Sequence, residues 1–151
     1  MTASQRLAEL GIALPPPTTP VGSYVPARRG GGLLFLSGHL AKSGGRVVTG
    51  RVGAEVDLGR ARELARLVAL DLVATAAEAA GGVDGLAGVV RLLGLVRSAP
   101  GFDQQPAVMN GASDLLVEIF GEAGRHARSA VGVSELPLGA ALEVEAIFAL
   151  A

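Results

Sequence analysis

Hydrophobic residues recur at helical spacing in a long segment in the middle of the chain, residues 57–80. Leu64, Val68 and Leu72 lie four residues apart and therefore share one face of a helix. The segment begins at an aspartate that can cap a helix and is followed by two glycines that can end it. This pattern predicts the longest helix of the chain.

Two further helices and an extended arm follow from similar signals. A helix is predicted over residues 106–123 by its apolar set, with Gly124 as its end. A short helix over residues 2–10 begins at a Thr-x-x-Gln capping box. Residues 12–22 hold four prolines and cannot form a helix, so they predict an extended arm laid over the domain.

Strand patterns occupy much of the remaining chain. Residues 141–150 alternate apolar residues with Glu143 and Glu145, which is the period of a strand with one buried face. Residues 88–98 are apolar on both faces and predict a strand that is covered on both sides. Other short strands are predicted at residues 24–27, 33–37, 46–48 and 129–133, with a hairpin turn over 28–32 and turns at 43–45 and 136–139.

The order β-β-(β)-α-β-α-β-β predicts an α+β fold, a mixed β-sheet with two helices packed on one face. Residues 1–20 are the N-terminal helix and proline-rich arm, and residues 21–151 form one domain. The other face of the sheet also carries apolar residues, and no element is left to cover it. We therefore expect this face to be buried in an oligomer.

Composition narrows the chemistry of this chain of 151 residues. It has no cysteine and only two histidines, which excludes thiolate catalysis and, within one chain, a three-histidine metal site, so we expect no metal. Lys42 is the only lysine and lies in a glycine-rich turn, which disfavours a Schiff-base enzyme. The formal net charge of −1 argues against a nucleic-acid or membrane partner. The N-terminus lacks an apolar signal segment, which favours a cytoplasmic location.

Four local motifs share their order and spacing with one protein family. Two lie near the N-terminus and two near the C-terminus: Val21-Gly22-Ser23-Tyr24-Val25, Leu33-Leu34-Phe35-Leu36-Ser37-Gly38-His39, Ala127-Arg128-Ser129-Ala130-Val131-Gly132-Val133 followed by Leu136-Pro137, and Leu142-Glu143-Val144-Glu145-Ala146-Ile147. Together they resemble the RidA family, also called YjgF or endoribonuclease L-PSP. The resemblance runs from about residue 20 to the end of the chain, and its two C-terminal motifs are the more specific.

The resemblance implies a chorismate-mutase-like (YjgF-like) fold and a homotrimer with ligand pockets in the clefts between subunits. It also implies metal-free, cofactor-free hydrolysis of reactive 2-imino or enamino acids to 2-keto acids and ammonia. In that reaction Arg128 binds the substrate carboxylate and Glu143 positions the attacking water. The resemblance places these further ligand-binding residues in the same cleft: Tyr24, Ser37, Gly38, His39, Asn110 and Ala130.

Departures from the family pattern keep other functions open. His126 replaces a proline and could line the cleft mouth, and Ala130 stands where deaminases often have cysteine. The chain could therefore be a non-catalytic trimer that binds a small carboxylate or keto acid. An endoribonuclease is disfavoured because the chain lacks a basic stripe and aromatic residues for base stacking. A chorismate-mutase-type reaction on a dianionic substrate would require a second cleft arginine.

The candidate residues also have structural interpretations. The planar guanidinium of Arg128 suits bidentate recognition of a carboxylate, but it could instead pair with a carboxylate at a subunit edge. Glu143 could be a solvated strand residue or a strut of the trimer, and His39 could be a hydrogen-bonded histidine near a turn.

Overall fold

A mixed sheet is the centre of the fold in residues 1–20 and 22–151, the part of the chain that the computed structural model describes. The strands follow the order β1-β2-β8-β6-β7, and β3 also pairs with β8. Strands β6 and β7 are parallel, and the other pairs of this sheet are antiparallel. Their bounds are β1 Ala27–Gly30, β2 Leu33–Leu36, β3 His39–Leu40, β6 Leu86–Arg97, β7 Ala127–Val133 and β8 Leu142–Leu150. A separate hairpin joins β4 (Lys42–Ser43) to β5 (Arg46–Val47).

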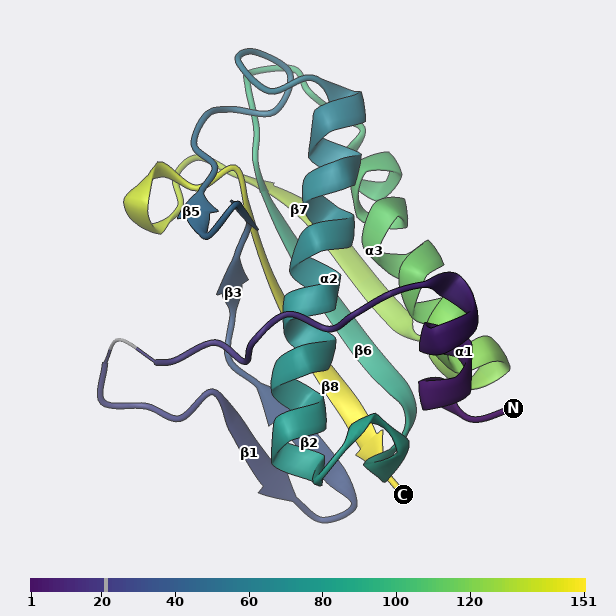
Figure 1. Cartoon of the computed structure of the whole chain (residues 1–151). Coiled ribbons are helices and arrows are strands. Elements are labelled where there is room, and N and C mark those ends of the chain that lie inside the picture. The colour runs from purple at the N-terminus through teal and green to yellow at the C-terminus, as the bar shows by residue number, and fades with distance from the viewer. Residues whose placement is uncertain (21) are drawn as a thin grey trace.

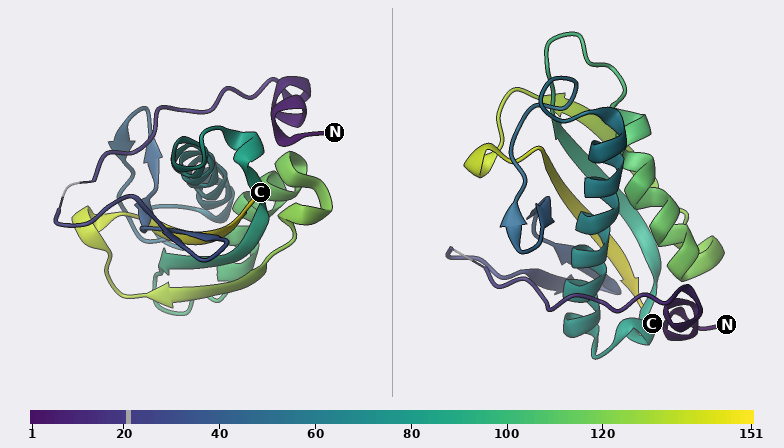
Figure 2. Two further views of the ribbon diagram at one scale, coloured as in Figure 1. Left: turned by 90° about the horizontal axis from the view of Figure 1, so that it is seen from below. Right: turned by 45° about the horizontal axis from the view of Figure 1, so that its top comes forward.

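Helices α2 (Leu58–Ala80) and α3 (Gln105–Phe120) lie side by side on one face of the sheet (Figures 1 and 2). Helix α1 (Ala3–Leu10) packs beside α3, and the short 3₁₀ turns are η1 (Val83–Gly85), η2 (Gly121–Gly124) and η3 (Pro137–Gly139). This arrangement confirms the predicted α+β fold with its mixed sheet. Among the described helices, none has the length and apolar character needed to cross a membrane.

Short-range hydrogen bonds place the ends of the first two helices where the sequence predicts them. Asp57 caps α2 by accepting a hydrogen bond from the Arg60 amide at 2.8 Å, and Gly81 ends it with a φ of 79°. The capping box of α1 also forms, because the Thr2 hydroxyl accepts from the Gln5 amide while the Gln5 side chain accepts from the Thr2 amide.

The first hairpin differs from its prediction. Residues 24–26 are not part of a strand, and β1 instead continues through Arg28 and Arg29 to Gly30. The Arg29 guanidinium donates to the Ala79 carbonyl at 2.7 Å, near the end of α2. This hydrogen bond links β1 to the helix. The predicted five-residue turn is therefore only two glycines long.

The end of α3 was also predicted too late in the chain. The helix stops before Gly121, whose backbone angles (φ 64°, ψ −138°) no side-chain-bearing residue adopts easily. The following residues form the η2 turn, so Gly124 ends that turn and not the helix.

The two faces of the sheet have different surroundings. The face under α2 and α3 carries the buried core, while no described element covers the opposite, open face (Figure 2, left). On the open face Phe35 and Val131 remain 43% and 44% exposed. Half-buried Leu93, Leu95 and Ile147 lie on the same face by the alternation of their strands. These five residues are called the apolar patch below.

Helices α2 and α3 are in close backbone contact at Gly111. A Cβ at this position would lie 2.1 Å from the Arg62 carbonyl oxygen, a backbone atom that cannot rotate away. We expect Gly111→Ala to lower the free energy of unfolding by about 1–3 kcal/mol in urea denaturation. The control is Gly59→Ala in the first turn of α2, where a Cβ meets only the Asp57 side chain at 3.5 Å. That change should be neutral or stabilising by about 0.4–1 kcal/mol, and an equal loss in both variants would contradict the packing argument.

Candidate functional site

Arg128 lies on edge strand β7, and its side chain is held by helix α3. Its Nη1 donates to Asn110 Oδ1 at 2.9 Å and to Ser113 Oγ at 3.1 Å. Within the described residues, Nε and Nη2 make no hydrogen bond or ion pair. These two nitrogens form the fork that binds a carboxylate in a bidentate way, so the arginine is oriented on one side and available on the other.

His126 supports this arrangement through Ser113. Its Nδ1 lies 2.7 Å from the Gly124 carbonyl oxygen, which can only accept, so Nδ1 carries the proton in the neutral ring. Nε2 then accepts from the Ser113 hydroxyl at 2.9 Å, while the same hydroxyl oxygen accepts from Arg128. The histidine that replaces the family's proline is therefore a positioning residue for Arg128. His126 and Arg128 also line one shallow pocket on the protein surface.

Glu143 occupies the open face of β8 and is half-buried. Burial raises the pKa of its carboxyl, and the charge of Glu145 raises it further. No hydrogen bond from another described residue stabilises the charged form. A carboxylate in this state is a stronger proton acceptor than an ordinary surface glutamate, which is what a general base requires.

The Glu143 carboxylate occupies space beside Gly38 that a larger residue would fill. A Cβ at position 38 would lie 2.6 Å from Glu143 Oε1 and 3.1 Å from Glu143 Cδ. The glycine after β2 is thus the wall against which the carboxylate rests. The sequence motif placed both residues in one cleft, and the structure brings them into contact.

We expect Gly38→Ala to displace the Glu143 carboxylate without unfolding the protein, because the contacted atoms belong to a rotatable side chain. If Glu143 acts in catalysis, activity should fall by about tenfold or more, since small misplacements of a reacting group have effects of this size or larger. Thermal unfolding of the same variant should change little. Full activity in Gly38→Ala would show that the position of the carboxylate does not matter.

Ser37 and Tyr24 are placed by one local contact. The Ser37 hydroxyl donates to the Val25 carbonyl at 2.7 Å, which ties the segment before β1 to the end of β2. Tyr24 lies in this tied segment and is 49% exposed. Val21, the first residue of the same motif, lies outside the described residues.

His39 does not reach a cleft, in contrast to the ligand-binding role expected from the motif. Its ring is buried, Nδ1 donates to the Ser37 carbonyl at 2.8 Å, and Nε2 accepts from the Thr75 hydroxyl at 3.0 Å. Burial lowers the pKa of the imidazole and keeps it neutral. Both ring nitrogens are thus used inside the core, and we treat His39 as a structural residue.

Arg128 and Glu143 are not brought together within one chain. Arg128 pairs in register with Leu92 and points to the helix face, as its contacts with α3 show. Glu143 pairs with Leu95 and lies on the open face, whereas its neighbours Leu142 and Val144 are fully buried in the core. Ala130, two residues after Arg128, packs against the core on the helix face. A site that uses both charged groups must therefore include a second copy of the chain.

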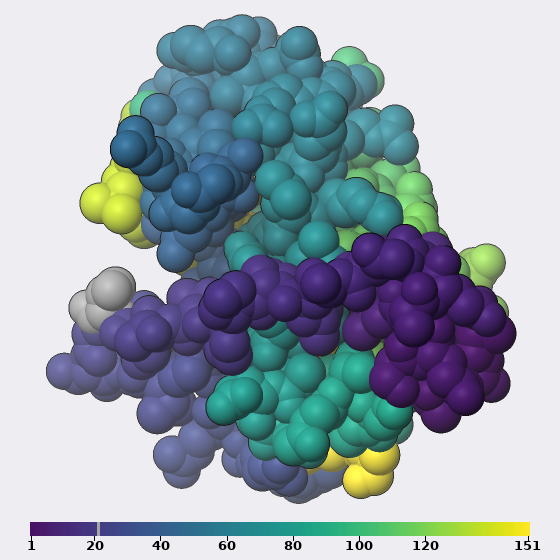
Figure 3. Space-filling model, viewed as in Figure 1, coloured from purple at the N-terminus to yellow at the C-terminus, as the bar shows by residue number. Residues whose placement is uncertain are grey.

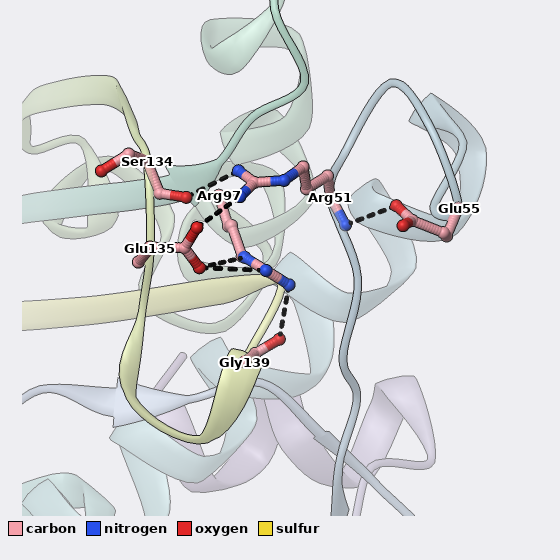
Figure 4. A network of polar contacts seen from close by, with 6 residues as sticks. All are labelled: Arg51, Glu55, Arg97, Ser134, Glu135 and Gly139. Atoms are coloured by element: carbon pink, nitrogen blue, oxygen red, sulfur yellow. Dashed lines mark hydrogen bonds and ion pairs between the residues drawn. The ribbon is translucent and has the colours of Figure 1, made fainter.

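The loop that leads from β7 into β8 is fixed by a cluster that the sequence did not indicate (Figure 4). Glu135 receives ion pairs from both Arg51 and Arg97, which lowers the pKa of this carboxyl. Arg51 also donates to the Ser134 carbonyl at 2.6 Å, and Arg97 to the Gly139 carbonyl at 3.3 Å. The cluster joins three distant segments and holds the start of the strand that carries Glu143.

No group of three metal-ligating side chains occurs in the described residues. The candidate groups of the site are a guanidinium fork, the amide and hydroxyl groups that orient it, and a carboxylate of raised pKa.

Comparison with known proteins identifies relatives over nearly the whole chain. A family model described as YjgF/chorismate mutase-like, "putative endoribonuclease", matches residues 4–150. The protein TCP17 of Trypanosoma cruzi is 44% identical over 146 residues, which are 95% of this chain and 91% of TCP17. The match from residue 4 onward includes α1 and the arm, which the sequence motifs left out.

The similarity to solved structures also extends over nearly the whole chain. Atu1372 of Agrobacterium tumefaciens, a protein of unknown function, is 40% identical with a TM-score of 0.88, and the match covers 99% of this chain and 94% of Atu1372. A Shewanella oneidensis protein described as a "putative endoribonuclease" is 31% identical with a TM-score of 0.93. That match covers 99% of this chain and 100% of the other.

Proposed function

Because the chain belongs to the YjgF/chorismate mutase-like family, we propose that it hydrolyses reactive 2-imino acids in clefts between the subunits of a homotrimer. The observation that carries this proposal is the placement of Arg128 and Glu143 on opposite faces of one sheet. A neighbouring copy that packs on the open face can bring its own Arg128 edge to Glu143. Each cleft then holds one of each group.

Arg128 binds the carboxylate of the imino acid in this proposal. The contacts with Asn110 and Ser113 fix one guanidinium nitrogen and direct the remaining fork outward. This fixed orientation reduces the entropy that is lost on binding. It also holds the imine carbon at a constant place relative to the water, which is the main requirement for a reactive electrophile.

Glu143 supplies the base. As the water oxygen bonds to the carbon of the protonated imine, the carboxylate takes one proton from that water and a carbinolamine forms. The carboxyl group then returns the proton to the amine nitrogen. The carbon–nitrogen bond breaks, the hydroxyl proton leaves with the nitrogen as ammonium, and the 2-keto acid remains.

The homotrimer is testable through the apolar patch. A stable interface buries about 800 Å² per partner, and an unpaired charge buried within it is costly. We expect the protein to sediment as a trimer at micromolar concentration, and Val131→Arg to sediment as a monomer. Leu10→Arg on α1 is the control, because Leu10 has nearly the same exposure, 43%, but lies away from the open face. A monomeric wild-type protein, or a trimeric Val131→Arg, would contradict this assembly.

The activity is tested by coupling the protein to an enzyme that generates imines, an amino-acid oxidase or a threonine dehydratase. Keto-acid release should be faster with the protein than without it, and a chelator should not change the rate. An unchanged rate, together with calorimetric binding of 2-ketobutyrate, would favour a non-catalytic protein that binds keto acids. The methyl group of Ala130, which adds no reactive atom beside Arg128, is consistent with that second function.

A further inference from the structure

A second pocket lies outside the candidate site, between the proline-rich arm and α2. It encloses about 590 Å³, which is within the usual range for sites that bind small molecules. Figure 3 shows the arm running across α2, with a hollow between the arm and the β4–β5 hairpin above it. The walls of the pocket come from three segments that are far apart in the sequence: Ala13 and residues 15–19 of the arm, residues 42–45 of the hairpin turn, and Leu67, Leu70 and Asp71 of α2.

The arm is anchored beside this pocket. The Thr18 amide donates to the Thr75 hydroxyl oxygen at 3.4 Å, and Thr75 donates in turn to His39 in the core. At the other end, Ser4 of α1 binds Asp84 through both its amide, at 2.9 Å, and its hydroxyl. The pocket wall formed by the arm is therefore held at both ends by specific hydrogen bonds.

Two opposite charges line the pocket without forming an ion pair with each other. Lys42 and Asp71 are both half-buried, and neither takes part in the ion pairs found among the described residues. Burial raises the pKa of the Asp71 carboxyl, and His39 and Lys42 nearby partly offset this effect. A half-buried charge outside a close ion pair is only partly compensated, so a ligand that supplies an ammonium to Asp71 and a carboxylate to Lys42 would be stabilised at both ends.

The remaining walls are apolar. The rings of Pro15, Pro16 and Pro17 face the pocket from the arm, and Leu67 and Leu70 face it from α2. We propose that this pocket binds a small zwitterion with an aliphatic side chain, that is, an aliphatic α-amino acid. The pocket lies on the helix side of the sheet, so it stays accessible when the open face is buried, and the proposal does not depend on the proposed reaction.

The single lysine gives a direct test of this proposal. Protein labelled with [¹⁵N]lysine shows one backbone amide signal, that of Lys42, and protein labelled with [¹⁵N]tyrosine shows one signal, that of Tyr24. Titration with L-leucine at millimolar concentration should shift the Lys42 signal saturably and leave the Tyr24 signal in place. The matched probes isoamylamine and 4-methylpentanoate each lack one charge and should bind at least tenfold more weakly.

Variants complete the test. Asp71→Asn and Lys42→Met should each weaken L-leucine binding at least tenfold in calorimetry, with thermal unfolding used to show that both variants are folded. Arg128→Ala should leave it unchanged. The proposal is overturned if leucine does not saturate, if it binds as well to the two pocket variants as to the wild type, or if Arg128→Ala abolishes binding. Equal affinity for 4-methylpentanoate would also overturn it, because an anion site at Lys42 would then suffice.

Discussion

Replacing Glu143 with glutamine is expected to lower the turnover number for imine hydrolysis by about 10²–10⁴, the usual contribution of a general base. Glutamine preserves the shape that rests on Gly38 but cannot take a proton from water. The affinity for 2-ketobutyrate should stay within about threefold, because the lost interaction is made mainly in the transition state. The coupled assay at saturating imine supply measures the first quantity, and calorimetry measures the second.

The pH dependence of the same reaction gives an independent check on Glu143. The ionised carboxylate is the active form, so the rate should fall as the pH is lowered through the raised pKa of Glu143. This acid limb should lie above the range of an ordinary glutamate. Glu145→Gln removes one cause of the shift and should move the limb to lower pH, with the plateau rate preserved. An acid limb that is the same in wild type and Glu145→Gln would argue against this assignment.

If Glu143 instead has a structural role at the trimer interface, a different result is expected. In that case Glu143→Gln would lose trimer stability and keto-acid binding together, which sedimentation and calorimetry would detect in one sample series. A wild-type protein that binds keto acid but does not accelerate hydrolysis would leave Glu143 without a catalytic role.

The sequence predicts those parts of the fold that depend on local interactions. The N-caps at Asp57 and Thr2 and the alternation around Glu143 depend on residues only a few positions apart, and each is found in the structure. The first hairpin was predicted less well, because three successive glycines suggest a long turn. The strand lies three residues later than predicted, and there Arg29 contacts Ala79, which is fifty residues away in the chain.

In the candidate site, too, some features follow from sequence motifs and others depend on contacts between distant residues. The resemblance places Gly38, Glu143, Asn110 and Arg128 in one cleft, whereas within one chain Gly38 lies against Glu143 on one face of the sheet and Asn110 binds Arg128 on the other. The motif alone could not show that the His39 ring turns into the core, because its partner Thr75 belongs to a distant helix. The Arg51–Glu135–Arg97 cluster and the pocket under the arm likewise combine residues that carry no joint signal in the sequence.

Arg128→Ala is expected to weaken binding of 2-ketobutyrate by one to three orders of magnitude. The variant removes a charge-assisted bidentate pair, which is worth roughly 2–4 kcal/mol in a desolvated cleft, and about 1.4 kcal/mol corresponds to one decade in affinity. Arg128→Lys should restore binding only in part, because an ammonium lacks the planar fork that pairs with a carboxylate through two parallel hydrogen bonds.

The matched control for Arg128→Ala is Arg125→Ala, which removes the same charge from the same pocket edge. The Arg125 side chain is 72% exposed and pairs with Glu122, three residues before it. Calorimetry should therefore find the affinity nearly unchanged in Arg125→Ala and strongly reduced in Arg128→Ala, with both variants sedimenting as the wild type does. If the two variants behave alike, the effect is general electrostatics, and Arg128 has no specific role. If Arg128→Ala keeps full affinity, the carboxylate binds elsewhere on the protein.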